Sequence, residues 1–372
     1  MDSDARLDLH ESLAVEVIDV HAEGEPGRVV LADGLGIEGA TMAQRLAWCE
    51  AHLDRLRTLL LREPRGYPAL CGVFVTPPVT PGADAGIIVL DQAGFRPMSG
   101  SNTMCAVTAL LETGVLARRA PQTLVRLDTA AGPVEAVARV RGGKVTSVQV
   151  RNVPSFVVGL DLPVDVLGVG TVAADVAFGG QFYVQAPAAA LGVELGAENA
   201  PAIARAAMGL LASAREQIDV RHPTEPDIDE IALVMLTGPA DRRVDRRVDA
   251  RNTVVLPSGR LDAGDDSTWR GTLDRSPCGT GTCARMACLH ARGQLRLGQE
   301  FVHEGALGTT FTGLLHEELA VGGLPAVLPS IEGRAWITGQ ARLRLDPGDP
   351  FPAGYAVADL WAQTDLGPGS GG

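Results

Sequence analysis

The sequence has very little lysine: Lys144 is the only one among 372 residues. It lies in Val140-Arg-Gly-Gly-Lys-Val145, where two glycines separate two β-like runs, so we expect it at a hairpin tip. Enzymes that use pyridoxal phosphate hold this cofactor as a Schiff base with a lysine inside a pocket. Because Lys144 is poorly placed for that role, amino-acid chemistry here is expected to proceed without a cofactor.

The chain also lacks an excess of positive charge and a long hydrophobic run. Its net charge of −13 argues against nucleic acid or an anionic membrane as a partner. No apolar stretch approaches the roughly 18 residues that a membrane span needs. The first residues, Met1-Asp-Ser-Asp-Ala-Arg6, are polar and acidic, unlike a signal peptide. We therefore expect a cytoplasmic globular protein, long enough for two domains.

The cysteines do not have the spacing of a disulfide-rich secreted domain, so we expect reduced thiols. They are Cys49, Cys71, Cys105, Cys278, Cys283 and Cys288. Cys283, Cys288 and His290 lie close together, but their spacing matches no familiar zinc pattern and a helix would not bring them to one face. We interpret them as small buried side chains and expect no metal site.

One pattern occurs twice, about half a chain length apart. The first copy runs from Ser99 to Gly114, and the second starts within Asp274-Arg-Ser-Pro-Cys-Gly-Thr-Gly-Thr282 and ends at Gly293. Both read X-Gly-(Ser/Thr)-x-Thr, where X is Ser99 or Cys278, and both reach their final glycine at the same offset. Two unrelated helices that end at glycine are the alternative. The shared offset and composition favour two similar lobes, each with a reactive residue at the start of a buried helix.

Two helix starts that face each other would suit proton transfer on both faces of one carbon. Unpaired backbone N–H groups at helix N-termini bind anions. A substrate carboxylate could bind to those of Gly100, Ser101, Gly279 and Thr280. The same groups would stabilise the charge left when a proton leaves the α-carbon.

The two residues at the position X differ in basicity. Cys278 is a credible base, because a helix N-terminus lowers the pKa of a thiol. Ser99 is a weak base, since its hydroxyl ionises far above neutral pH, and it could instead relay a proton or donate one to a departing hydroxyl. Asp274 could hold a substrate ammonium. Alternatively, it caps the loop or pairs with Arg275.

Short strands with few helices predict an α+β fold. Helices are expected at 41–62, with Thr41 as N-cap and Gln44 completing a capping box, and at 199–217. Residues 152–156 are interpreted as a junction between lobes. Strands are expected at 15–19, 28–32, 69–76, 85–90, 124–128, 134–141, 145–150, 172–178, 182–186, 231–236, 252–256, 309–314 and 333–345.

These residues resemble the proline racemase superfamily, whose enzymes work without cofactors. Asp274 to Thr282 is similar to its second active-site motif, and Met98 to Thr103 to its first, which usually reads Met-Cys-Gly-His. Further matches are Gly24-Glu-Pro26, Glu63-Pro-Arg-Gly66, Asn152-Val-Pro-Ser-Phe156, Phe178-Gly-Gly180 and Gly333-Arg-Ala-Trp-Ile337. The resemblance implies a diaminopimelate-epimerase-like fold, in which two pseudo-symmetric α/β lobes each wrap a β-sheet around a central helix.

On this basis we divide the chain into two lobes and two tails. The first lobe, 13–157, carries Ser99 and is completed by 345–364, and the second, 158–344, carries Cys278. Residues 1–12 and 365–372 are expected to be flexible tails.

The resemblance also implies roles for single residues. Cys278 corresponds to the second catalytic cysteine and Ser99 takes the place of the first, while Asp274 falls where the family binds the ring nitrogen. Glu230 falls near a position that faces the substrate ring. The remaining matches fall where the family binds the carboxylate: Gly100, Ser101, Gly279 and Thr280.

Ser99 for cysteine and Ser101 for histidine argue against simple proline racemisation, and Ser/Cys members of the family are similar to those that handle hydroxyprolines. Our first expectation is dehydration of trans-3-hydroxy-L-proline to Δ1-pyrroline-2-carboxylate. The alternative is a 4-hydroxyproline 2-epimerase that converts trans-4-hydroxy-L-proline into cis-4-hydroxy-D-proline, and one enzyme could do both. A non-catalytic amino-acid-binding protein is an alternative of another class, and a metal-dependent hydrolase lacks a convincing ligand set. The expected partner is a small imino acid, and a homodimer is compatible with exposed strand edges.

Overall fold

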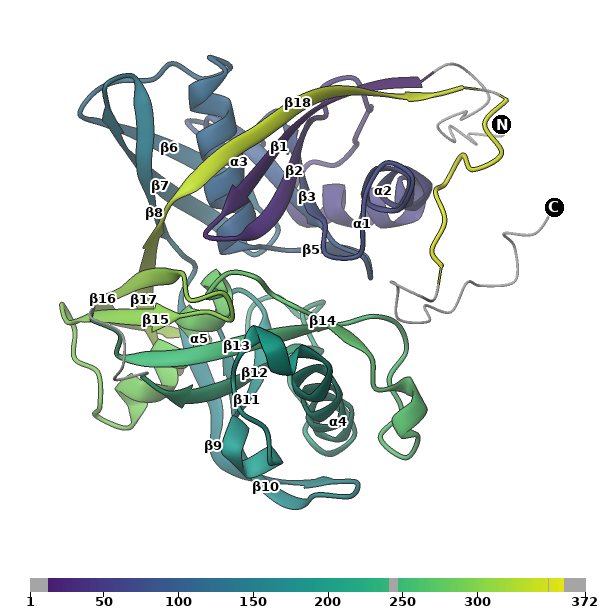
Figure 1. Cartoon of the computed structure of the whole chain (residues 1–372). Helices are drawn as coiled ribbons and strands as arrows, with labels where there is room; N and C mark the ends of the chain where they lie inside the picture. Colours follow the sequence, from purple (N-terminus) through teal and green to yellow (C-terminus); the bar gives the residue numbers. More distant parts are fainter. Residues whose placement is uncertain (1–12, 241–246, 347, 358–372) are drawn as a thin grey trace.

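The structure is a computed structural model that describes residues 13–240, 247–346 and 348–357. It has two lobes, drawn one above the other in Figure 1. The expected tails, 1–12 and 365–372, lie outside the described residues, as does part of the segment 345–364. The expected α+β fold of two pseudo-symmetric lobes is confirmed by the strand pairings below.

In the first lobe the strands pair in the order β18–β1–β2–β3–β4–β6–β7–β8. The pairs β2–β3 and β4–β6 are parallel and the others antiparallel, and β8 also pairs with the end of β17. The short β5 lies beside β4. The bounds are β1 (Leu13–Ala22), β2 (Glu25–Leu31), β3 (Cys71–Thr76), β4 (Ala85–Leu90), β5 (Phe95–Arg96), β6 (Gln122–Thr129), β7 (Gly132–Arg141), β8 (Lys144–Arg151) and β18 (Ala335–Leu345).

The second lobe repeats this plan. Its strands pair in the order β9–β10–β11–β12–β13–β15–β16–β17, with β11–β12 and β13–β15 parallel, and β17 also pairs with β9, which closes the sheet. The short β14 lies beside β13, as β5 lies beside β4. The bounds are β9 (Ser155–Val166), β10 (Gly170–Phe178), β11 (Phe182–Pro187), β12 (Ile231–Pro239), β13 (Ala250–Pro257), β14 (Gly271–Leu273), β15 (Glu300–Glu304), β16 (Thr310–Val321) and β17 (Leu324–Gly333).

A buried helix runs through each sheet: α3 (Gly100–Glu112) in the first lobe and α5 (Gly279–Ala291) in the second. Every residue of α3 from Gly100 to Leu111 is buried, as expected for a helix that is surrounded by a sheet. Each central helix is also the crossover between two parallel strands, β4 to β6 and β13 to β15. The repeated motif thus starts the equivalent helix in both lobes.

Three further α-helices contact the strands from outside: α1 (Met42–His52), α2 (Asp54–Leu61) and α4 (Ala200–Gln217). The single helix expected at 41–62 is wrong, because the helix breaks at Leu53, where no glycine or proline marks the end. Thr41 is the N-cap, and its hydroxyl accepts from the Gln44 N–H. The helix expected at 199–217 is confirmed as α4. Short 3₁₀ helices occur at Ala188–Leu191, Ala197–Asn199 and Asp266–Thr268.

The expected boundary between lobes needs one correction. Residues 335–344 were assigned to the second lobe, but β18 pairs with β1 along the whole of β1 and so lies in the sheet of the first lobe. The chain crosses between lobes at 152–154, as the junction predicted, and again at Arg334, where β17 ends and β18 begins. The second lobe is therefore inserted between two segments of the first (Figure 1).

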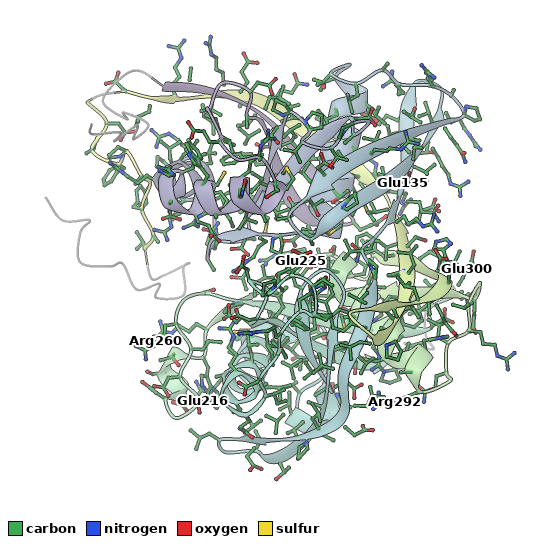
Figure 2. All side chains as sticks on the ribbon, turned by 180° about the vertical axis from the view of Figure 1, so that it is seen from behind. Glu135, Glu216, Glu225, Arg260, Arg292 and Glu300 are labelled. Atoms are coloured by element: carbon green, nitrogen blue, oxygen red, sulfur yellow. The ribbon has the colours of Figure 1, made fainter. Side chains whose placement is uncertain are left out.

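Figure 2 shows the side chains of both lobes. Lys144 follows the Gly142–Gly143 turn between β7 and β8, half-exposed, and pairs with Glu112. All six cysteines are buried and free of disulfides. Within the described ranges no helix is long and apolar enough to cross a membrane, and no three His, Cys, Asp or Glu side chains gather as metal ligands.

Candidate active site

The two central helices begin at one cavity between the lobes. It has a volume of about 40 Å³, so one small molecule there would contact several of its polar walls at once. Most of the predicted site residues line it: Ser99, Ser101, Asp274, Cys278, Gly279 and Thr280. Gly100 is not part of the wall but touches it, since its Cα lies 2.8 Å from a Cβ built on Gly279. The two copies of the motif, far apart in sequence, thus meet in space.

Cys278 is the N-cap residue of α5 and has an unusual backbone. Its φ of 59° lies in the left-handed region, which a non-glycine residue rarely adopts. Its N–H donates to the Ser276 hydroxyl at 3.1 Å, and this holds the turn before the helix. The Sγ atom lies 3.4 Å from the hydroxyl of Tyr183, which is also 2.7 Å from that of Thr280. The backbone and these hydroxyls together fix where the thiol points.

The environment of Cys278 raises the pKa of its thiol well above the ordinary value. Burial is the main cause and the charge of Asp274 comes second, whereas hydrogen bonds from Tyr183 and the Gly281 N–H act in the opposite direction. The expectation of a thiol pKa lowered by the helix N-terminus is therefore wrong. Removal from water outweighs the helix dipole here.

Ser99 is the N-cap residue of α3, the position that Cys278 has in α5. Its Oγ accepts from the backbone N–H of Asn102 at 3.3 Å and from the Asn102 side-chain amide at 3.1 Å. The Ser101 hydroxyl lies 3.2 Å away. Because two donors occupy its lone pairs, Ser99 is better arranged to donate its proton than to remove one.

Asp274 is buried directly before the turn that leads into α5. Its Oδ1 accepts from the backbone N–H and from the hydroxyl of Ser276, each at 2.8 Å. Burial raises the pKa of Asp274, while these two bonds lower it. The loop-capping role considered from the sequence is thus present, and the carboxylate also faces the cavity. Arg275 is not its partner, because the Arg275 guanidinium donates to the Leu273 carbonyl, and the Arg275 backbone N–H donates to Glu25.

Further polar residues line the cavity that the sequence did not single out: Glu25, Cys71, Arg96 and Tyr183. Arg96 is held by Asp91 through its Nε, at 2.7 Å. Glu25 lies in the Gly24-Glu-Pro26 match, which was the one available signal. The others lie on β3, β5 and β11, and no motif marks them.

Glu230, predicted to face the substrate ring, is not part of the cavity wall. Its carboxylate lies 2.7 Å from Arg215, and its side chain is 58% exposed. It lies between the 222–228 turn and β12, and Arg215 reaches it from α4. Arg215 thus holds this carboxylate beside the cavity wall and not in it, where its charge still acts on Arg96.

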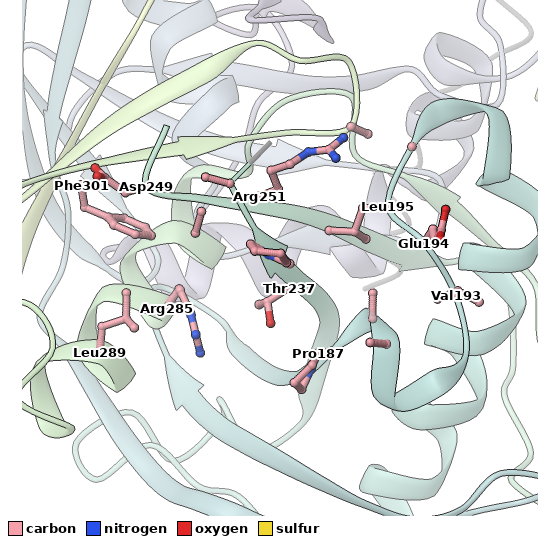
Figure 3. A pocket seen from close by; sticks show the side chains of 18 of the residues that line it. Pro187, Val193, Glu194, Leu195, Thr237, Asp249, Arg251, Arg285, Leu289 and Phe301 are labelled. Atoms are coloured by element: carbon pink, nitrogen blue, oxygen red, sulfur yellow. The ribbon is translucent and has the colours of Figure 1, made fainter. Parts of the chain in front are cut away.

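A larger hollow of about 1200 Å³ lies elsewhere in the second lobe (Figure 3). Among its lining residues are Pro187, Thr237, Arg251 and Arg285, and none of them lines the cavity between the helices. Its two arginines are already paired, Arg251 with Glu304 and Arg285 with Asp175. The convergence of motifs, rather than size, therefore identifies the candidate site.

Two helix starts, each with a proton-carrying side chain at one small cavity, define an enzyme of the amino-acid racemase and epimerase class. The chain belongs to the proline racemase family, which it matches over residues 17–356. The relatives that the chain matches are named as epimerases, which favours an enzyme over the binding-protein and metal-hydrolase alternatives.

One named relative and two solved structures are similar to the chain over most of its length. The chain is 43% identical to the 4-hydroxyproline 2-epimerase of Streptosporangium roseum over 341 residues, 91% of this chain and 97% of the relative. A crystal structure of a hydroxyproline epimerase from Agrobacterium vitis with bound trans-4-OH-L-proline is 36% identical, with a TM-score of 0.85 and coverage of 94% and 96%. A Bacillus anthracis phenazine biosynthesis protein of the PhzF family, 14% identical at a TM-score of 0.55 over 89% of this chain and 99% of its own, shares the fold alone.

Proposed function

We propose that this chain epimerises 4-hydroxyproline at the α-carbon, converting trans-4-hydroxy-L-proline into cis-4-hydroxy-D-proline. The observation that carries the proposal is the meeting of Ser99, Cys278 and Asp274 at one cavity, the first two at helix N-caps. The names of the relatives support the same substrate. Epimerisation was our second expectation from the sequence, and these names rank it first.

In the proposed reaction the substrate carboxylate binds to backbone N–H groups at the starts of α3 and α5, and Asp274 binds the ring ammonium. Cys278 and Ser99 then act on opposite faces of the α-carbon. One accepts the α-proton and the other returns a proton on the opposite side. The helix N-termini stabilise the negative charge that develops between the two steps.

Substrate binding also changes the thiol. The charge of Asp274 helps to raise the pKa of Cys278. A bound ammonium offsets that charge, so the thiolate becomes easier to form when the substrate is in place. Proton removal is thereby coupled to the presence of a cationic nitrogen.

Dehydration of trans-3-hydroxy-L-proline is a second candidate, favoured by the asymmetry between Ser99 and Cys278. Loss of the 3-hydroxyl after α-proton removal needs a base on one face only, and the enamine tautomerises to Δ1-pyrroline-2-carboxylate. The arrangement of Ser99 as a proton donor is compatible with protonating a departing hydroxyl.

One experiment separates the two reactions. The protein is incubated in D2O with trans-4-hydroxy-L-proline, trans-3-hydroxy-L-proline and L-proline in turn. We expect cis-4-hydroxy-D-proline with deuterium at the α-carbon, resolved by chiral chromatography and mass spectrometry. Imine from the 3-hydroxy substrate alone would favour dehydration. No product and no α-deuterium from any of the three would overturn both candidates.

A further inference from the structure

Two buried carboxyl groups from different lobes meet at the candidate site. Glu25 is the first residue of β2 in the first lobe, directly after the Glu23–Gly24 turn, and Asp274 follows β14 in the second. They are 5% and 6% exposed, both line the cavity, and their carboxyl groups share a hydrogen bond. Two adjacent carboxylates cannot both ionise cheaply away from water. One of them therefore carries the proton of this hydrogen bond.

The contacts around the pair decide which one it is. Asp274 receives two hydrogen bonds from Ser276, a backbone N–H and a hydroxyl, at a single oxygen. Glu25 accepts the Arg275 N–H at 2.6 Å on Oε2, and its Oε1 accepts only the weak thiol donor of Cys71 at 3.5 Å. Asp274 thus has the better-solvated negative charge. Burial, followed by the charge of Asp274, raises the pKa of Glu25 well above its ordinary value.

Other charged or titratable groups act on Glu25 from the elements packed around it. Arg275 precedes α5, Cys71 is on β3, Cys105 is on α3, and Tyr67 is in the segment before β3. Arg275 is the one cation among them. It lowers the pKa of Glu25, but burial and the charge of Asp274 raise this pKa by more. The balance therefore favours the neutral form of Glu25.

We propose that Glu25 is a positioning residue that works as a neutral carboxylic acid, donating its proton across the lobe interface to Asp274. The donated bond orients Asp274 toward the cavity and keeps a single negative charge for the substrate ammonium. A second negative charge at this place would hold the Cys278 thiol protonated. The expected changes in kcat and KM rest on the proposed function, whereas the protonation state of Glu25 can be tested without it.

The neutral form makes a sharp prediction, because glutamine mimics a carboxylic acid and not a carboxylate. In Glu25→Gln the side-chain amide can donate to Asp274 and its oxygen can accept from Arg275. We expect kcat and KM for 4-hydroxyproline to stay within about threefold of the unmodified chain, since both bonds survive. Glu25→Ala removes both and should raise KM about 10- to 100-fold, the worth of a hydrogen bond to a charged group.

A spectroscopic measurement tests the proton directly and needs no activity. The infrared difference spectrum between the unmodified chain and Glu25→Gln should contain the carbonyl band of a protonated carboxylic acid, shifted in D2O. Glu135→Gln, a half-exposed carboxylate on β7 (Figure 2), serves as the control and should show no such band. Absence of the band in the Glu25→Gln difference would overturn the proposal. So would a KM for Glu25→Gln that rises as far as that for Glu25→Ala, because Glu25 would then bind as an anion. If the band is present while no hydroxyproline is turned over, the proposed function fails and the assignment of Glu25 stands.

Discussion

Gly100 and Gly279 lie back to back at the starts of the two central helices. A Cβ built on Gly100 would lie 2.9 Å from the Cα of Gly279, and one built on Gly279 would lie 2.8 Å from the Cα of Gly100. The side chain of Ile331, on β17, closes the same space, with its Cδ1 2.6 and 2.5 Å from those two positions. Only glycine lets both helix N-termini point at one cavity, so the spacing of the two lobes is set at this contact.

We expect Gly279→Ala to force the two helix starts apart. Overpacking of this kind costs about 1–3 kcal/mol of stability, and misplacing the reacting groups by about 1 Å lowers kcat/KM about 10²-fold. Steady-state epimerisation and urea unfolding measure the two effects. Gly34→Ala is the matched control, because no atom lies within 4 Å of a Cβ built on Gly34. Equal activities of the two variants would contradict the importance of the contact.

Because a hydroxyl and a thiol differ in acidity, we expect substitution of Ser99 and of Cys278 to remove different parts of the reaction. Cys278→Ala should lower kcat/KM about 10²- to 10⁴-fold and abolish α-deuterium exchange, since the thiol is the stronger acid–base group. Ser99→Ala should lose inversion but retain exchange of one epimer, because the thiol can remove a proton and return it on its own face. Chiral chromatography with mass spectrometry distinguishes inversion from exchange. Cys49→Ala, a buried thiol on α1, controls for loss of a cysteine. Exchange abolished equally in Ser99→Ala would show that serine is needed on the thiol's own face.

The raised pKa of Cys278 predicts how its alkylation depends on pH. Burial and then the charge of Asp274 raise this pKa, so iodoacetamide should react slowly at neutral pH and faster as pH rises above 9. Asp274→Asn removes the second cause and lowers the thiol pKa. At a given pH below the pKa, the rate should rise about tenfold for each unit by which it falls. Peptide mass spectrometry follows Cys278, with Cys283 on the same helix as an internal reference. Slower alkylation in Asp274→Asn would contradict the assigned cause.

His303 predicts a loss of stability in acid. It is fully buried, its Nδ1 lies 2.9 Å from the Thr282 hydroxyl, and burial, followed by Arg285, lowers its pKa to about 3. The unfolded chain has the ordinary histidine value of about 6.5, so it binds the extra proton between about pH 6.5 and 3. Stability should fall as pH drops through this window, by up to about 1.4 kcal/mol per pH unit from this residue.

Urea unfolding of the unmodified chain and His303→Gln at pH 7, 6, 5 and 4 measures this effect. The variant should be less stable at pH 7, because a packed side chain is lost, and the difference should shrink as pH falls. A difference that stays constant over the four pH values would show that folding does not lower the pKa of His303.

The fold was predictable where the local pattern was strong. Turn residues and periodicity predicted the Gly142–Gly143 turn, the helix at 200–217 and the two helices that the motifs start. Strands β9 and β17 were missed, as were the shorter β5, β14 and β15. Gly159 and Pro163 interrupt β9, and Pro325 and Pro329 interrupt β17, and such residues usually signal loops. The place of β9 and β17 in the closed sheet depends on pairing with each other, which no local pattern encodes.

The candidate site was predictable only as far as its motifs. Ser99 and Cys278 could be identified because they occupy the same position in a repeated motif. Tyr183 and Arg96 also line the cavity, but they come from strands that carry no motif. The direction of the Cys278 pKa was missed for a physical reason: a helix N-terminus is visible in a sequence, whereas the loss of water around a thiol is a property of the assembled lobes. Glu230 was expected in the wall but lies beside it, because its partner Arg215 comes from α4 and no local pattern links the two residues.

The insertion of the second lobe has a consequence for synthesis on the ribosome. β1 is made first, yet its full-length antiparallel neighbour β18 is made after every strand of the second lobe. Until then one edge of the first sheet has unpaired backbone groups, the kind of edge that attracts other chains. The second lobe draws all its strands from one continuous segment and can close as soon as β17 emerges. The half of the protein that is translated later is thus the half that can finish folding first.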